Sequence, residues 1–191
     1  VEGVYGAEWY NNTPVLTNRA AEHNATLPFT RNVVGPMDYT PGTFSDSQHP
    51  HITSYGHELA LPVIFESDLQ HMPDRPSVYY DMPEPVKKLL SDLPAAWDDT
   101  ELLTGYPGME VVMARRKGDV WYIAGINGTN EPRTLCFSLK DLSVAGKKTT
   151  LFEDGTDDRS FAIEENLPLS EDEMNLEIKC LPRGGFVAVI K

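Results

Sequence analysis

Two glutamates stand six residues apart near the beginning of the sequence, in the stretch VEGVYGAEWYNN. Glu2 and Glu8 have three aromatic neighbours, Tyr5, Trp9 and Tyr10. Paired carboxyl groups among aromatic rings suit the hydrolysis of glycosidic bonds, because one carboxyl can give a proton to the leaving oxygen while another acts as base or nucleophile. The rings could stack on the apolar face of a sugar. The alternative, two surface glutamates beside rings that only pack, stays open.

Further candidates are an aspartate and several histidines. Asp38, in GPMDYTPG, would share a rim with the two glutamates if PMDY is a strand of an α/β barrel, and it could equally cap a helix. His23 has no second histidine at i+3 or i+4, so we expect a hydrogen-bonded structural residue rather than a metal ligand. His49, His51 and His57 form only a weak metal-binding pattern.

The composition restricts the class of partner. The chain has 191 residues, 40% of them apolar, and carries a net charge of -13. A negative field of that size repels phosphate backbones, so we expect no nucleic acid partner. No apolar run is long enough for a membrane span. The late acidic residues are better explained by a solvated face than by a cation site. They are Glu153, Asp154, Asp157, Asp158, Glu164, Glu165, Glu171, Asp172 and Glu173.

The pattern of the first half predicts an α/β unit in residues 1–94. Apolar periodicity predicts helices over residues 22–34, 54–72 and 84–93, although Pro28 and Pro62 oppose the first two. Residues 35–44 lie between prolines and can hold only a brief strand. Because the chain opens on Val1 in the middle of this pattern, with no signal segment, we expect it to be a piece of a longer protein.

The second half, residues 95–191, reads as all β. Short runs rich in Val, Ile, Phe and Tyr, separated by turn signals, predict an antiparallel sandwich or barrel. The predicted strands cover residues 109–116, 119–127, 133–139, 148–154, 174–181 and 185–191. Cys136 and Cys180 both fall in such runs, and we interpret them as buried apolar residues that could pair if their strands are neighbours.

Three aromatic residues of the second half, Trp97, Trp121 and Tyr122, distinguish two uses of that region. Exposed on a flat face, they would indicate sugar binding. Buried, they would belong to the core, which is the expectation for aromatic residues in strands.

Three stretches of the chain resemble glycoside hydrolase family 97, a bacterial family of α-glucosidases and α-galactosidases. They are EGVYGAEWYN, EHNATLPFTRNVVGPMDYTPGTF and YPGMEVVMARRKGDVWYIAGING, and they include LPFTR, GPMDYTPG and a Glu-Gly-x-x-Gly-x-Glu pattern. The resemblance covers nearly the whole chain and corresponds to the last third of the family. It implies the C-terminal part of a (β/α)8 TIM barrel in residues 1–94, followed by an antiparallel β-sandwich domain in residues 95–191.

The resemblance also implies roles for the two glutamates. Glu8 matches the general acid of the family, and Glu2 matches a ligand of its catalytic Ca2+, which the carboxylate of Glu8 would also contact. Asp38 is expected only to support the site. The base or nucleophile, the N-terminal sandwich and the early barrel would come from the remainder of the same enzyme, so the 191 residues alone should be inactive. An α-linked oligosaccharide or glycoside would be the substrate, in a periplasmic or secreted bacterial protein.

Overall fold

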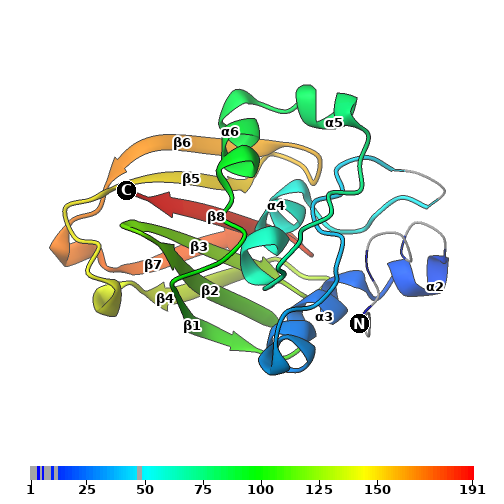
Figure 1. Ribbon diagram of the computed structural model, residues 1–191, viewed down its shortest axis with the longest axis horizontal. Coiled ribbons are helices and arrows are strands. Elements are labelled where there is room, and N and C mark those ends of the chain that lie inside the picture. The colour runs from blue at the N-terminus through cyan, green and yellow to red at the C-terminus, as the bar shows by residue number, and fades with distance from the viewer. Residues whose placement is uncertain (1–3, 5, 7–9, 11–12, 47–48) are drawn as a thin grey trace.

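The computed structural model describes residue 4, residue 6, residue 10 and the ranges 13–46 and 49–191 (Figure 1). Its helices are α2 (Pro14–Thr17), α3 (Ala20–Thr26), α4 (Tyr55–Ile64), α5 (Pro76–Tyr80) and α6 (Glu84–Asp92), with single 3-10 turns at Leu27–Phe29, Arg31–Val34, Lys140–Leu142 and Glu171–Glu173. Its strands are β1 (Asp99–Tyr106), β2 (Glu110–Lys117), β3 (Val120–Asn127), β4 (Arg133–Ser138), β5 (Lys148–Asp154), β6 (Phe161–Pro168), β7 (Asn175–Cys180) and β8 (Gly185–Ile190).

The strands form two antiparallel layers. Six of them build one sheet in the order β1-β2-β3-β8-β5-β6, and β4 pairs with β7 in a second, two-stranded sheet. Alternate residues of the central strands β3 and β8 face opposite sides. Trp121, Ile123 and Phe186 pack toward β4 and β7, whereas Tyr122, Ala124 and Val187 face a second apolar cluster. The antiparallel β architecture predicted for the second half is therefore confirmed.

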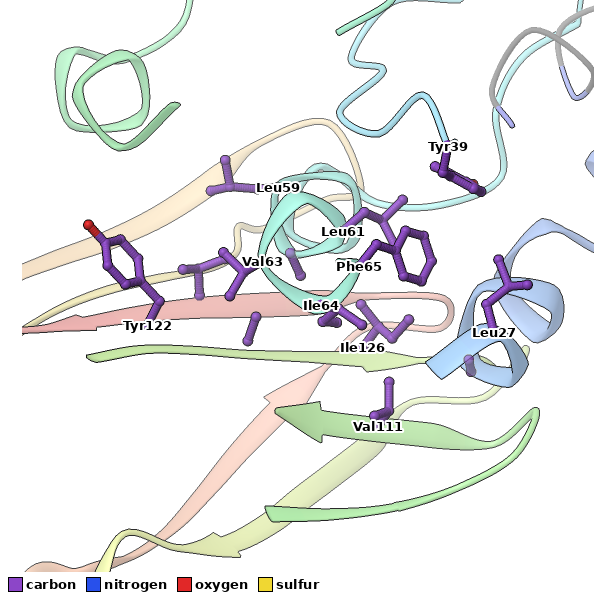
Figure 2. Packing of buried hydrophobic residues seen from close by; sticks show 14 of the residues in the cluster. Leu27, Tyr39, Leu59, Leu61, Val63, Ile64, Phe65, Val111, Tyr122 and Ile126 are labelled. Atoms are coloured by element: carbon purple, nitrogen blue, oxygen red, sulfur yellow. The ribbon is translucent and has the colours of Figure 1, made fainter. Parts of the chain in front are cut away.

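Helix α4 covers the other face of the large sheet. Leu59, Leu61, Val63 and Ile64 are at most 1% exposed and belong to the same cluster as the sheet residues Val111, Tyr122 and Ile126. Figure 2 shows Val63 and Ile64 pointing from α4 toward these strands. Burying four large aliphatic side chains contributes several kcal/mol, on the order of 2 kcal/mol each. Residues before and after position 94 therefore share one core, and the division into domains at that position stays a prediction.

The helix predictions of the first half were partly wrong. The segment 22–34 forms α3 followed by two 3-10 turns, because Pro28 lacks the N–H that would continue the α-helical bonding. The segment 54–72 is helical only over Tyr55–Ile64, where Pro62 lies near the end. The third helix is confirmed at Glu84–Asp92. No helix within the described ranges is long and apolar enough to cross a membrane.

The brief strand predicted in residues 35–44 is not formed. The described contacts give this segment one backbone bond to the region after α4, from the Met37 N–H to the Glu66 carbonyl at 3.0 Å, which does not make a ladder. A strand needs a neighbour along its length, and no described segment lies beside this one in that way. That residues 1–94 are part of a TIM barrel therefore rests on the resemblance alone.

The cysteine prediction is half right. Cys180 is buried and Cys136 is exposed, and both are free thiols. Their strands β7 and β4 are neighbours, as the disulfide required, but Cys136 lies opposite Glu177 and Cys180 lies opposite Arg133. Positions 177 and 180 point to opposite faces of the strand, so the two sulfur atoms cannot meet.

Candidate functional site

The two glutamates predicted to carry the chemistry, Glu2 and Glu8, lie outside the described residues. Tyr10, two positions after Glu8, is described and is only 6% exposed. Its carbonyl accepts a hydrogen bond from the Thr17 hydroxyl, and its ring meets the His23 ring edge-on at 6.3 Å. The segment that carries the predicted acid therefore leads into a buried environment, and we describe the site from Tyr10 inward.

A line of buried polar groups begins beside Tyr10. The Tyr39 hydroxyl donates to the Asn24 side-chain oxygen at 2.8 Å, and the Asn24 amide nitrogen lies 3.1 Å from Nε2 of His57. Asn24 comes from α3, His57 comes from the first turn of α4, and all three side chains are at most 3% exposed. Tyr10 and Tyr39 line the same small cavity, and burial raises the pKa of Tyr39, with neighbouring Tyr10 adding to that shift. We refer to Tyr10, Tyr39, Asn24 and His57 as the polar chain.

The position of His57 follows from how α4 begins. Ser54 is the N-cap, and its hydroxyl accepts a hydrogen bond from the His57 backbone N–H at 3.1 Å. Burial lowers the pKa of His57 to about 3, with the charge of His51 contributing in the same direction. The imidazole is therefore neutral near pH 7. Because the Asn24 amide donates to Nε2, the ring proton resides on Nδ1.

Glu58 follows His57 in α4 and faces the same region. It is 6% exposed, and its carboxylate accepts bonds from the Thr53 hydroxyl and from the Thr43 backbone N–H at 3.1 Å. Burial raises the pKa of Glu58, and His51 and the two hydrogen bonds oppose this shift. A cavity of about 10 Å³, the size of one water molecule, lies between Tyr10, Tyr39 and Glu58.

We expect the buried neutral His57 to make the chain acid-sensitive. An unfolded histidine titrates near pH 6.5, so the unfolded chain binds this proton more tightly than the folded chain, and stability falls as pH drops below 6.5 toward 3. Between pH 6.5 and pH 4.5, His57 alone should lower the free energy of unfolding by about 2.5 kcal/mol. Denaturant unfolding of the wild type and of His57→Gln at several pH values measures this effect. The free energy of unfolding should change more steeply with pH in the wild type than in His57→Gln.

The control for this measurement is His71→Gln, at an exposed position. The buried carboxyl groups of Glu58 and Asp154 have raised pKa values and act in the opposite direction, but they are present in every variant and cancel in the comparison. Parallel curves of stability against pH for the wild type and His57→Gln would contradict a neutral buried His57.

The remaining predicted site residues do not join the polar chain in the described contacts. Asp38 is exposed to solvent. His51 is buried and its Nδ1 lies 2.9 Å from the Thr53 carbonyl, while His49 is half-buried. The part of the chain that the structure describes contains no group of three or more His, Cys, Asp or Glu residues that could hold a metal ion. His23 has a pKa lowered by burial and by Arg19, in keeping with a structural role.

The three aromatic residues of the second half belong to the core. Trp121 and Tyr122 are each 6% exposed. Trp97 is half-buried, its ring lies 5.3 Å from that of Tyr122, and the Arg115 guanidinium lies over it at 5.9 Å. The interpretation as core residues is confirmed, and these rings offer no flat exposed face for a sugar.

A set of hydrogen bonds that could not be predicted from the sequence fixes α4 to the sheet. Asp154, at the end of β5, accepts hydrogen bonds from the Ser54 hydroxyl and from the backbone N–H groups of Leu181 and Gly185, the last two at 3.1 and 3.0 Å. Gly56 lies against this carboxylate, since a Cβ atom on Gly56 would be 2.5 Å from Oδ1 of Asp154. We call Asp154, Ser54, Gly56, Leu181 and Gly185 the Asp154 joint.

Two glycines allow the close approach at this joint. A Cβ atom on Gly56 would lie 2.2 Å from the Gly185 carbonyl oxygen, and a Cβ atom on Gly185 would lie 2.7 Å from the His57 Cα. No side chain fits either gap. The joint therefore determines where the first turn of α4 lies, and with it His57 and Glu58.

Comparison with known proteins identifies the family. Residues 96–191 match the family model described as "Glycosyl-hydrolase 97 C-terminal, oligomerisation". The chain is 46% identical over 125 residues to a probable retaining alpha-galactosidase of Streptomyces bingchenggensis, which covers 65% of this chain and 18% of that protein. It is 33% identical over 205 aligned positions to the retaining alpha-galactosidase of Bacteroides thetaiotaomicron, covering 100% of this chain and 30% of that protein.

A solved structure agrees with these relatives. A glycoside hydrolase family 97 enzyme from Pseudoalteromonas sp. strain K8, in complex with acarbose, superimposes with a TM-score of 0.84 at 29% identity, over 100% of this chain and 31% of that one. The chain thus spans less than a third of the length of each of these proteins. The chain belongs to glycoside hydrolase family 97, and residues 96–191 correspond to the C-terminal domain of that family.

Proposed function

We propose that the chain is part of a calcium-dependent, exo-acting α-glycosidase that hydrolyses α-galactosides with retention of configuration, and that Glu8 is its general acid. The observation that carries the proposal is the 33% identity to a retaining alpha-galactosidase along the entire chain, supported by the 46% identity to a second one. α-Glucosides are the other substrate class in question, because the related Pseudoalteromonas enzyme was solved with acarbose. We also propose a periplasmic or secreted location.

The proposal divides the chemistry between this chain and the rest of the enzyme. Glu8 gives its proton to the glycosidic oxygen as the bond breaks, and the nucleophile comes from the part of the relatives that this chain does not span. Glu2 and Glu8 would bind Ca2+ through their carboxylate oxygens, the ligand type that this ion prefers. When bound, the ion organises the carboxylates and orients sugar hydroxyls. Further ligands would also come from the rest of the enzyme.

A second function, without chemistry, is proposed for residues 96–191. The matching family model carries the word oligomerisation in its description, and the large aromatic residues of this region are core residues rather than a sugar-binding face. This domain would then support or assemble the enzyme. The two proposals are compatible, because they concern different residues of one chain.

The test uses the full-length enzyme and two nitrophenyl substrates. We expect kcat/KM to be at least about tenfold higher for the α-galactoside than for the α-glucoside, since a single sugar hydroxyl that a buried polar group recognises is worth that much or more. Proton NMR of the first product formed should show the α-anomer. Release of the β-anomer would refute retention, and a preference for the glucoside would refute the substrate class. The 191-residue chain alone should give no hydrolysis.

Calcium binding has its own readout in Trp9, which is adjacent to Glu8 in the sequence. Removal of Ca2+ by a chelator should abolish turnover and change tryptophan emission, and added Ca2+ should restore both. Trp9→Phe should remove most of the emission change and keep the metal dependence of turnover. Full activity in excess chelator would contradict the calcium proposal.

A further inference from the structure

We propose that the polar chain positions the general acid, so that Tyr39 and Thr17 are positioning residues of the glycosidase. This inference rests on the assignment of Glu8 as the acid and adds to it a set of buried contacts around Tyr10, the described residue two positions after Glu8.

Tyr10 is the point where the segment of the acid is held. Three contacts restrain it: its carbonyl accepts from the Thr17 hydroxyl, its ring packs edge-on against His23, and its side chain lies beside that of Tyr39 at one small cavity. Two residues of extended backbone reach at most about 7 Å. Fixing Tyr10 therefore restricts the positions that Glu8 can occupy.

Tyr39 connects Tyr10 to the helices. Its hydroxyl donates to the Asn24 side-chain oxygen, and its side chain lines the same small cavity as that of Tyr10. Its ring packs edge-on against Phe65 with 4.7 Å between ring centres, which fixes the side chain from the other side. The Asn24 amide in turn donates to the neutral His57 ring, which the Asp154 joint places. These two donors, the Tyr39 hydroxyl and the Asn24 amide, point in one direction, toward His57.

The polar chain does more than fill the core. Phenylalanine at position 39 would pack as well, and burying hydroxyl, amide and imidazole groups costs free energy that their mutual bonds only offset. Hydrogen bonds add direction, which apolar contacts lack. They join three segments, at residues 24, 39 and 57, in a single arrangement, and residue 10 lies against it. Such directional contacts are what an acid needs, because displacing a reacting group by about 1 Å can cost a factor of 10² in rate.

The experiment compares two pairs of variants in the full-length enzyme. Thr17→Val removes the hydroxyl that donates to the Tyr10 carbonyl, and Tyr39→Phe removes the hydroxyl that lies beside the Tyr10 side chain and donates to Asn24. Their controls are Tyr80→Phe, at an exposed tyrosine, and Thr26→Val, which removes a similar bond from a threonine hydroxyl to the Glu22 carbonyl within α3. For each variant we measure kcat and KM on an α-galactoside with a poor leaving group and on one with an activated leaving group, together with the melting temperature.

We expect Tyr39→Phe and Thr17→Val to lower kcat/KM about tenfold or more for the poor leaving group and less than about threefold for the activated one, with KM unchanged. A misplaced acid matters only where the leaving oxygen needs a proton, and a mere loss of stability would affect both substrates equally. The controls should match the wild type on both substrates.

Equal losses on the two substrates in both Tyr39→Phe and Thr17→Val would overturn the inference, and so would the absence of any loss. Glu8→Gln, measured alongside, separates this failure from that of the proposed function. If Glu8→Gln discriminates between the leaving groups while the two positioning variants do not, only the inference fails. If Glu8→Gln does not discriminate, the acid assignment fails and the inference fails with it.

Discussion

Replacing Glu8 by glutamine should lower kcat/KM of the full-length enzyme by about 10²–10⁴-fold for an α-galactoside with a poor leaving group. Glutamine keeps the size of the side chain and its hydrogen-bonding capacity but has no proton to give. An alkoxide leaving group cannot depart without one, so the step that breaks the glycosidic bond carries the entire loss. A factor of 10³ corresponds to about 4 kcal/mol of transition-state stabilisation.

The size of this loss should depend on the leaving group. With a dinitrophenyl α-galactoside, which departs as a stable anion, kcat/KM should fall by less than about tenfold, because kcat/KM reports the first chemical step and that step then needs little proton transfer. Glu22→Gln, in the exposed first turn of α3, is the matched control and should leave both substrates unaffected. Equal losses of Glu8→Gln on both substrates would remove Glu8 from the acid role.

Glu2→Gln separates the metal ligand from the acid. If Glu2 binds Ca2+, this variant should need more Ca2+ for half-maximal activity, and saturating Ca2+ should restore part of its turnover on both substrates alike. Glu8→Gln should show no such recovery on the poor leaving group. The two glutamates six residues apart would then have different measurable phenotypes, as their proposed roles require.

The central strands could be predicted from the sequence because each is a short run rich in apolar residues that ends at a turn signal. Strands β2, β3, β4, β5, β7 and β8 all fall within predicted runs, with ends displaced by one residue at most. The two strands that escaped prediction, β1 and β6, are the two edges of the six-stranded sheet. In β6, Phe161 and Ile163 pack on the core, but Glu164 and Glu165 are exposed and Asn166 has a positive φ of 61°. In an edge strand of this kind, apolar and polar residues alternate only weakly, and charged residues suit its exposed side.

The sequence allows a prediction of the candidate site only where the information is local, and the assignments of Glu2 and Glu8 stay predictions. Glu2, Glu8 and Tyr10 lie within one short motif, so their types and spacing suggested the chemistry. The polar chain gives no such signal, because Asn24 lies 15 residues from Tyr39 and 33 from His57. Each of these residues, taken alone, suits a helix or a loop. What brings them together are contacts between residues far apart in the sequence, such as those of Asn24 with His57 and of Thr43 with Glu58.

The same reasoning applies to the Asp154 joint, and it leads to the largest expected effect on stability. The sequence placed Asp154 among exposed acidic residues, whereas the fold sets it 100 residues from its partner Ser54, in a partly buried position. Asp154→Ala removes the acceptor of three donors: the Ser54 hydroxyl and the backbone N–H groups of Leu181 and Gly185. A buried donor left unsatisfied costs about 1–3 kcal/mol, and water can replace some of these bonds.

We therefore expect Asp154→Ala to lower the free energy of unfolding by about 3 kcal/mol and the melting temperature by roughly 6–12 °C. Asp154→Asn should lose less, because one side-chain oxygen still accepts and the Ser54 hydroxyl can turn to accept from the new amide. Asp172→Ala, at an exposed position, should match the wild type. Thermal and denaturant unfolding of the four proteins measures the order.

The order of stability, wild type above Asp154→Asn above Asp154→Ala, is the outcome that distinguishes a hydrogen-bonding role from an electrostatic one. Burial raises the pKa of Asp154, so its charged form by itself disfavours the folded state. Because Asp154 binds its proton more tightly in the folded chain than in the unfolded chain, this group adds stability as pH falls toward its unfolded pKa. If the charge dominated, both neutral variants would be as stable as the wild type or more so. If Asp154→Ala loses stability and Asp154→Asn does not, the stabilising role of Asp154 lies in its oxygen atoms as hydrogen-bond acceptors. Because the joint places the first turn of α4, Asp154→Ala should also weaken the contact between His57 and Asn24, and with it the support of Tyr10.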